Sequence, residues 1–167
     1  FQVDGIRLIP LQLKNSEPDN QPVGFYPSHA VESRFGTILL EHEKGYLEIN
    51  MNTASADSGF AARWHPLDKG CQGLAKDKQG NVFLLSGGTI YSCQQNGLLR
   101  GYFHTGLSKL SYLSIDRNEN FWMADKLDKK VYRLNNNNFQ EIKILAREGK
   151  YVDTLNPVVL SIYEDKH

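Results

Sequence analysis

The fold is decided by the stretch LSIDRNENFWMA, residues 113–124, because the stretch LAKDKQGNVF at residues 74–83 repeats its pattern. Both stretches contain a short apolar run, an aspartate, a polar turn and a second apolar run. The two aspartates, Asp77 and Asp116, hold the same place in the pattern and lie 39 residues apart. The chain therefore contains a repeat with a period near forty residues.

The repeat extends beyond these two stretches in both directions. In order, Trp64, His65, Gly73, Leu74 and Asp77 correspond to Phe103, His104, Tyr112, Leu113 and Asp116. A further copy, VLSIYEDKH, opens at residues 159–167, where the sequence ends. A period of this length with several short apolar runs in each period is typical of an array of four-stranded sheets. We therefore expect an all-β fold.

Each period predicts four strands: a run that ends at the aspartate, a hairpin pair and an outer strand. The predicted hairpin pairs are residues 36–41 with 46–49, 80–85 with 89–93, and 120–124 with 130–134. Outer strands follow at residues 98–103 and 139–145. The four asparagines at 135–138 are interpreted as a turn, because Asn tolerates the left-handed backbone conformation. No segment carries the pattern of a helix of ordinary length.

The copies at residues 74–83, 113–124 and 159–167 resemble the blades of β-propellers of the two-component-regulator type, and more loosely of NHL and lactonase-like propellers. In that group a short apolar strand, an Asp, a Gly-Asn turn and a strand that often bears Trp follow one another. The resemblance covers roughly residues 64–167. The chain departs from the group at residues 118–120, where Asn-Glu-Asn replaces Gly-Asn. The resemblance implies a ligand- or protein-binding module, such as the sensing part of a bacterial envelope or regulator protein.

On this basis we expect about three four-stranded antiparallel blades of an incomplete propeller. The expected organisation is an N-terminal strand and linker at 1–24, blades at 25–69, 70–109 and 110–153, and the first strand of a further blade at 154–167. A blade buries its faces only against its neighbours, and propellers close with about four to eight blades. The remaining blades are therefore expected from the same, longer chain or from another subunit. The resemblance implies an extracytoplasmic location, periplasmic or at the cell surface.

Composition excludes some partners. The 19 basic and 19 acidic residues balance, and no basic stripe alternates with stacking aromatics, so we expect no nucleic-acid partner. No apolar run approaches the ~20 residues needed to cross a bilayer, so no membrane span is expected in this segment. Cys71 and Cys93 lack the paired spacing of a zinc site, and buried or unpaired thiols are expected.

The residues nominated for a ligand lie in loops that precede the inner strands and in turns between the two hairpin strands, where a channel mouth would be. They are Trp64, His65, Asp68, His104, Lys109, Tyr112, Asp125, Lys126 and Asp153. The expected partner is a small molecule, a glycan or a protein. No catalytic residue and no cofactor is predicted in this interpretation.

Two alternatives remain open. His65 and His104 occupy the same repeat position, and Asp153 stands at the matching place in the third copy, so the three could hold one divalent metal. That arrangement would favour a metal-dependent lactonase- or lyase-like enzyme. The other interpretation of the histidines is a structural hydrogen bond that ties the outer strand to the next inner strand. In the second alternative, the blades are structural and complete a larger complex.

The recurring aspartates, Asp77, Asp116 and Asp165, are interpreted as structural. Each stands just before a turn, where an Asp side chain can accept hydrogen bonds from the amides that follow. We therefore do not nominate them as catalytic carboxylates.

Overall fold

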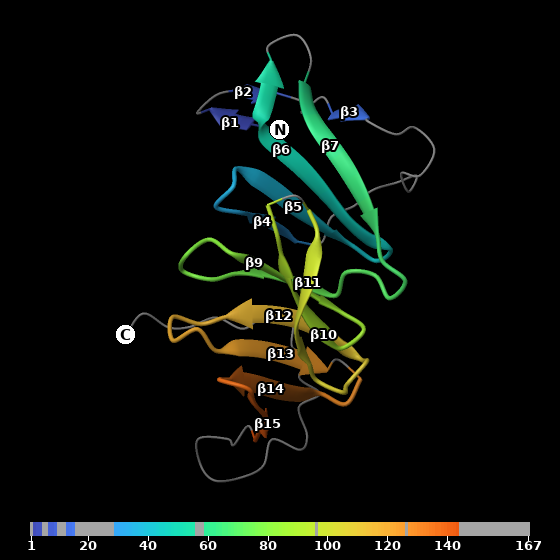
Figure 1. Cartoon of the computed structure of the whole chain (residues 1–167), viewed down its shortest axis with the longest axis vertical. Coiled ribbons are helices and arrows are strands. Elements are labelled where there is room, and N and C mark those ends of the chain that lie inside the picture. The colour runs from blue at the N-terminus through green and yellow to red at the C-terminus, as the bar shows by residue number, and fades with distance from the viewer. Residues whose placement is uncertain are drawn as a thin grey trace.

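The computed structural model describes residues 29–55, 59–95, 97–125 and 127–143, together with the backbones of three short strands before them. Every regular element in these residues is a β-strand, which confirms the all-β expectation. No helix in the described part has the length and apolar character of a membrane span. Figure 1 shows the sheets following one another along the long axis of the molecule.

Three antiparallel meanders of four strands, the first, second and third blades, follow each other in chain order. The first consists of β4 (Ala30–Glu32), β5 (Thr37–His42), β6 (Gly45–Ser55) and β7 (Gly59–Pro66). The second consists of β8 (Gly73–Lys76), β9 (Val82–Ser86), β10 (Thr89–Cys93) and β11 (Leu99–His104). The third consists of β12 (Leu110–Ile115), β13 (Phe121–Asp125), β14 (Lys130–Asn135) and β15 (Asn138–Ile142). The predicted sequence of inner strand, hairpin pair and outer strand is therefore confirmed in all three.

Three further strands precede the first blade. β1 (Gln2–Asp4) and β2 (Arg7–Ile9) form an antiparallel pair. β3 (Leu13–Asn15) lies parallel to β7 and adds a fifth strand to the outer edge of the first blade.

The inner strand β8 contacts both β4 of the first blade and β12 of the third, so neighbouring blades meet along their inner strands. Gly73 allows β8 to lie close to β12: a Cβ atom there would lie 2.7 Å from the Leu113 backbone nitrogen and 2.8 Å from the Leu113 Cβ. Gly73 and Tyr112 are repeat partners, so the small residue is required in one blade and not in the next.

Two apolar clusters fill the spaces between neighbouring blades. Between the first and second blades lie Val31, Leu39, Tyr46, Cys71, Leu74, Val82 and Leu84. Between the second and third lie Ala75, Phe83, Leu85, Ile90, Leu110, Leu113, Phe121, Met123, Tyr132 and Leu134. Along β9 every side chain is buried, and successive ones enter opposite clusters: Val82 and Leu84 face the first blade, Phe83 and Leu85 the third.

The turn between the first two strands of a blade carries the recurring aspartate. In the second blade, Asp77 Oδ1 accepts from the Asn81 amide at 2.8 Å and Oδ2 accepts from Asn81 Nδ2 at 2.6 Å. In the third blade, Asp116 Oδ1 accepts from the amides of Asn118 at 2.8 Å and Asn120 at 2.9 Å. The predicted structural role of the aspartate is confirmed in these two copies.

The first blade makes the same turn with different residues. The Ser33 and Thr37 hydroxyl oxygens lie 2.6 Å apart, and the Ser33 amide donates to the Thr37 carbonyl at 2.8 Å. The equivalent backbone bond in the second blade joins the Asp77 amide to the Asn81 carbonyl at 3.0 Å. Asp165, the last recurring aspartate, lies outside the described residues. We call the end of the blades that carries these three turns the turn end.

The opposite end, the loop end, carries the hairpin turns and the connections between blades. For the third blade the two ends are easily followed in Figure 1, where β12 points toward the turn end and β13 away from it. At the loop end of the first blade, the Gly70 amide donates to the Leu67 carbonyl and the Cys71 amide donates to the His42 carbonyl at 3.1 Å. The connection between the first two blades is thereby fastened to the blade that it leaves.

Candidate functional site

Most of the nominated residues with described positions lie at the loop end. Asp68 and Lys109 are exposed in the connections that lead from one blade to the next, and Tyr112 is half-buried on β12. The structure therefore places Asp68 and Lys109 at the end predicted for a ligand, on separate connections, and Tyr112 on an inner strand. Lys126 and Asp153 lie outside the described residues.

Asp125 is buried, with 4% of its surface exposed, and it serves its own hairpin turn. Its Oδ1 accepts from the amides of Leu127 at 2.9 Å and Asp128 at 3.0 Å. In the first blade, His42 acts in the same way, because its Nδ1 accepts from the Lys44 amide at 3.1 Å. These hydrogen bonds give the Asp125 carboxylate a structural role, which is to close its own hairpin turn.

His65 belongs to a cluster on the outer half of the first blade. Its Nε2 lies 2.9 Å from Glu48 Oε2, and its ring stacks on Tyr46 with centroids 4.5 Å apart. The Tyr46 hydroxyl donates to the Gly97 carbonyl at 2.8 Å. Because Gly97 belongs to the outer turn of the second blade, the cluster holds that turn against the first blade.

Gly97 has little freedom at this contact. Its φ is +74°, and a Cβ atom there would lie 2.7 Å from Glu48 Oε2 and 2.8 Å from His65 Cε1. Burial raises the pKa of the Tyr46 hydroxyl, and the nearby Cys93 thiol and Glu48 carboxylate raise it further. Tyr46 therefore remains a neutral donor to the Gly97 carbonyl at physiological pH.

His104 is exposed at the end of β11, and its Nδ1 lies 2.8 Å from Thr89 Oγ1 on the neighbouring strand β10. Both repeat-related histidines thus stand on the outer strand of their blade and bond a side chain of that same blade. Within the described ranges, no three His, Cys, Asp or Glu side chains gather in a way that could hold a metal ion. Asp153, the third ligand of the metal alternative, stays a prediction.

Trp64 lies on the face of the first blade that is turned away from the second. It packs beside Leu47, Ile49 and Ala62, and its ring meets the His42 ring edge-on with centroids 5.4 Å apart. The partly buried side chains of this face are Ile38, Leu40, Met51, Phe60 and Trp64. Trp64 is therefore part of an apolar sheet face.

A hollow of about 250 Å³ lies at the turn end, between the first and second blades. Its lining residues are Glu32, Ser33, Arg34, Lys76, Asp77, Lys78, Gln79 and Gly80. They come from the ends of β4 and β8 and from the turns that follow these inner strands. Neighbouring blades therefore contribute equivalent segments to one concave site.

The two turns that line the hollow are joined directly. The Arg34 amide donates to the Gly80 carbonyl at 2.9 Å, and the Arg34 guanidinium carbon lies 4.8 Å from the centroid of the Phe35 ring. Gly80 has φ +77°, and a Cβ atom there would lie 2.8 Å from the Arg34 Cβ. The backbone on both sides of the hollow is therefore fixed.

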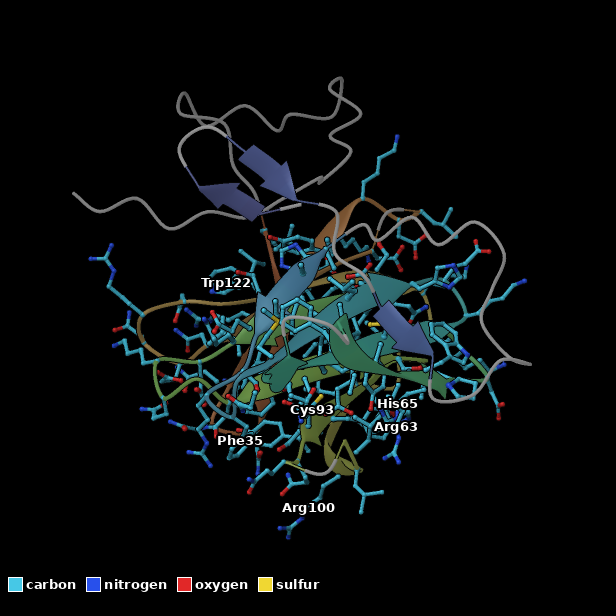
Figure 2. All side chains as sticks on the ribbon, turned by 90° about the horizontal axis from the view of Figure 1, so that it is seen from above. Phe35, Arg63, His65, Cys93, Arg100 and Trp122 are labelled. Atoms are coloured by element: carbon cyan, nitrogen blue, oxygen red, sulfur yellow. The ribbon has the colours of Figure 1, made fainter. Side chains whose placement is uncertain are left out.

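Figure 2 shows the turn end and the loop end of the blades on different sides of the view. Phe35 and Trp122, which lie by the turns of the first and third blades, appear on one side, and His65 and Arg63 appear on the other. The sequence-based nomination addressed the loop end and missed the hollow. The signal available for the hollow was a basic residue directly after the first turn residue, which is Arg34, Lys78 or Arg117.

Comparisons with known proteins show the fold. No protein-family description matches the chain, and no curated protein matches it either. A streptogramin B lyase structure is 15% identical with a TM-score of 0.50, over 67% of this chain and 38% of that one. A catalytically inactive variant of virginiamycin B lyase from Staphylococcus aureus, solved with quinupristin, is 14% identical with a TM-score of 0.53, over 69% of this chain and 40% of that one.

The chain thus spans about two fifths of the length of these similar structures. Sequence identities this low support a conclusion about the fold only, and not about function. Together with the three stacked four-stranded meanders, they identify the fold of this chain as β-propeller blades.

Proposed function

We propose that this chain is part of a β-propeller that recognises a ligand without transforming it. The observation that carries the proposal is the turn-end hollow, which neighbouring blades build from equivalent segments. Sites shared between structural units are common places for small molecules to bind. The ligand or partner would be a small molecule, a glycan or a protein.

Two polar groups of the hollow that could take part in chemistry, the Ser33 hydroxyl and the Asp77 carboxylate, are already engaged. The Ser33 hydroxyl lies 2.6 Å from the Thr37 hydroxyl, and the Asp77 carboxylate accepts two hydrogen bonds from Asn81. Both groups stabilise the turns and are poorly suited to act as a nucleophile or a base. Apart from the Glu32 carboxylate, the remaining side chains of the lining are cationic or amide groups, which suits recognition.

The resemblance to two-component-regulator propellers supports a sensing role in a bacterial envelope or regulator protein, with an extracytoplasmic location. In this proposal the exposed loop-end residues Asp68, His104 and Lys109 offer a second contact surface to a protein partner. In both the sensing role and the contact with a protein partner, the chain acts by binding.

The test combines binding with recovery of the ligand. The purified chain is screened by thermal shift against neutral oligosaccharides, organic acids and amino acids, and each hit is incubated with the protein and followed by NMR. Its metal content is measured by mass spectrometry. We expect saturable binding and unchanged ligand. A stoichiometric divalent metal together with conversion of the ligand would instead establish the metal-dependent enzyme alternative.

A second candidate function is completion of a larger propeller by these blades. It is favoured by the apolar face of the first blade, where Phe60 and Trp64 are only partly buried. A blade face of this kind is stabilised by a neighbouring blade, supplied by the same, longer chain or by another subunit. Size-exclusion chromatography with light scattering tests this candidate, because assembly between copies would give a mass that is a multiple of 19.0 kDa.

A further inference from the structure

We propose that the turn-end hollow between the first and second blades is an anion site, which binds a carboxylate or phosphate group between Arg34 and Lys78. This inference rests on the proposed binding function and names the chemical class of its ligand. Arg34 comes from the first blade and Lys78 from the second, and both line the same hollow.

The charges of the lining favour an anion. Arg34, Lys76 and Lys78 are cationic, and within the described ranges no carboxylate lies within ion-pair distance of any of them. The Asp77 carboxylate is turned to its own loop, where it accepts hydrogen bonds from Asn81 at 2.8 and 2.6 Å. Glu32, at the end of β4, is the remaining acidic side chain of the lining. Three cations therefore face two carboxylates in this lining, and an excess of positive charge in a concave site attracts anions to it.

The Arg34 backbone is held in place, and its exposed side chain contacts a neighbouring ring, before any ligand binds. Its amide donates to the Gly80 carbonyl of the facing turn at 2.9 Å, and its guanidinium lies over the Phe35 ring at 4.8 Å. A planar guanidinium held in this way can give two parallel hydrogen bonds to a carboxylate or phosphate. Such pre-organisation reduces the conformational entropy that binding would cost.

The turn itself does not explain the basic residues. The hydrogen bonds that close it come from its first residue and from the residue four positions later, as Asp77 and Asn81 show. The basic residue that follows the first turn residue is Arg34 in the first blade and Lys78 in the second. Among the contacts described for these two residues, neither side chain bonds to the turn closure. A repeated cation at the same end of neighbouring inner strands is therefore better explained by a ligand.

The size of the hollow limits the ligand. Its volume of about 250 Å³ lies below the ~300 Å³ at which pockets for drug-sized molecules begin. It therefore admits a small anion, or the acidic end group of a longer molecule. An acidic sugar and a phosphate both meet this condition.

The experiment titrates the chain with inorganic phosphate and with galacturonate, and uses galactose as the neutral counterpart of galacturonate. Isothermal titration calorimetry at constant ionic strength measures each dissociation constant. The variants are Arg34→Gln, Lys78→Gln and the double variant. Lys44→Gln is the matched control, because it removes the same charge from an exposed position at the loop end. Circular dichroism verifies that every variant is folded.

We expect phosphate or galacturonate to bind the unaltered chain and galactose not to bind. Each cation removed from the hollow should weaken binding roughly tenfold, because a hydrogen bond to a charged group contributes that much. Lys44→Gln should leave the affinity unchanged. Binding of phosphate alone or of galacturonate alone would each support the site and would identify the source of its anionic group.

Three outcomes would overturn the anion site: no binding of either anion, equal affinity in the double variant, or an equal loss in Lys44→Gln. These outcomes are separable from failure of the proposed function. Neutral hits in the thermal-shift screen would preserve the binding function while rejecting the anion site. Chemical conversion of a bound anion would preserve the site while rejecting a purely binding role.

Discussion

The indole nitrogen of Trp122 donates a hydrogen bond of 2.8 Å to Oδ2 of Asp116. The same oxygen accepts from Asn120 Nδ2 at 2.8 Å, and Oδ1 accepts from the amides of Asn118 and Asn120. Asp116 follows β12 and Trp122 stands on β13, so one carboxylate joins the inner strand of the third blade to its neighbour and closes the turn between them. The Arg133 guanidinium lies 5.8 Å from the centroid of the Trp122 ring.

Replacing Asp116 by alanine should destabilise the chain by about 2 kcal/mol, because the buried Asn120 and the half-buried Trp122 lose a charged acceptor. Asp77→Ala should cost less, since Asp77 accepts two hydrogen bonds, both from Asn81. Urea unfolding followed by circular dichroism measures both. Asp68→Asn, at an exposed position, is the control and should change stability by less than about 0.5 kcal/mol. Equal costs for Asp77→Ala and Asp116→Ala would contradict a role for the indole.

Asp116 should also make stability depend on pH. Burial opposes ionisation, but hydrogen bonds from Trp122, Asn120 and Asn118 outweigh it and hold the pKa of Asp116 below its usual value. A depressed pKa gives stability that is present above the unfolded value near 3.9 and is lost as pH falls through the folded value. Between pH 5 and pH 2, the unaltered chain should therefore lose more stability than Asp116→Asn. Parallel pH profiles of the two proteins would show that Asp116 is uncoupled from folding.

The sequence predicted the strand order because each blade repeats its apolar runs around an aspartate, as at Asp77 and Asp116. It also predicted the turn at residues 135–138, because asparagine tolerates the left-handed backbone conformation. Asn136 and Asn137 do have positive φ values of 45° and 66°. The first blade was harder to align, because Ser33 stands where the other blades have Asp. Hydroxyl and carboxylate groups can close the same turn, and that equivalence is visible only in three dimensions.

Glu119 is expected to be replaceable by glycine with a gain in stability. Its φ is +62°, and the equivalent residue of the second blade is Gly80, with φ +77°. A left-handed backbone costs a residue with a side chain about 1–2 kcal/mol, while glycine loses about 0.5–1 kcal/mol through the entropy of the unfolded chain. Glu119→Gly should therefore raise stability by roughly 0.5–1 kcal/mol in urea unfolding.

The control for Glu119→Gly is the opposite kind of change, from glycine to a residue with a side chain, at the equivalent position of the second blade. Gly80→Ala places a Cβ atom 2.8 Å from the Arg34 Cβ at a positive φ, so it should be destabilising. If Glu119→Gly lowered stability instead, the Glu119 side chain would have to make contacts that outweigh its backbone strain.

Gly73 tests the stacking of the inner strands. A Cβ atom at this position would lie 2.7 Å from the Leu113 nitrogen, which is backbone and cannot move without shifting β12. Gly73→Ala should therefore cost about 1–3 kcal/mol, the usual range for overpacking. Gly101→Ala is the matched control, because no atom lies within 4 Å of a Cβ built there. A tolerated Gly73→Ala would mean that the second and third blades do not approach as closely as described.

The functional site was less predictable than the fold. His65 and His104 were candidate ligands because they occupy the same repeat position. In the structure each imidazole bonds a side chain of its own blade: His65 bonds Glu48, and His104 bonds Thr89. The hollow, in contrast, depends on two turns that are distant in sequence and meet through the bond from Arg34 to Gly80. A repeat reveals which residues are equivalent, but the space between two repeats depends on how the blades pack.

The two thiols should be almost unreactive in the folded chain. Both Cys71 and Cys93 are free, and they belong to or pack against the apolar cluster between the first and second blades. Burial, followed by the charge of Glu48, raises the pKa of the Cys93 thiol to about 12. Burial also raises the pKa of the Cys71 thiol, with a further contribution from Glu41. At pH 8 the reactive thiolate of Cys93 should then amount to on the order of one molecule in ten thousand.

Ellman's reagent measures this directly. At pH 8 the native chain should react far more slowly than a free thiol, and both of its cysteines should react at once in denaturant. Cys71→Ala assigns the remaining signal to Cys93. Raising the pH from 8 to 10 should accelerate the Cys93 reaction roughly a hundredfold while the chain stays folded, because the thiolate fraction rises by that factor below its pKa. Rapid labelling of Cys93 at pH 8 would contradict its packing against the cluster between the blades, since a thiol fully open to water keeps a pKa near 8.5.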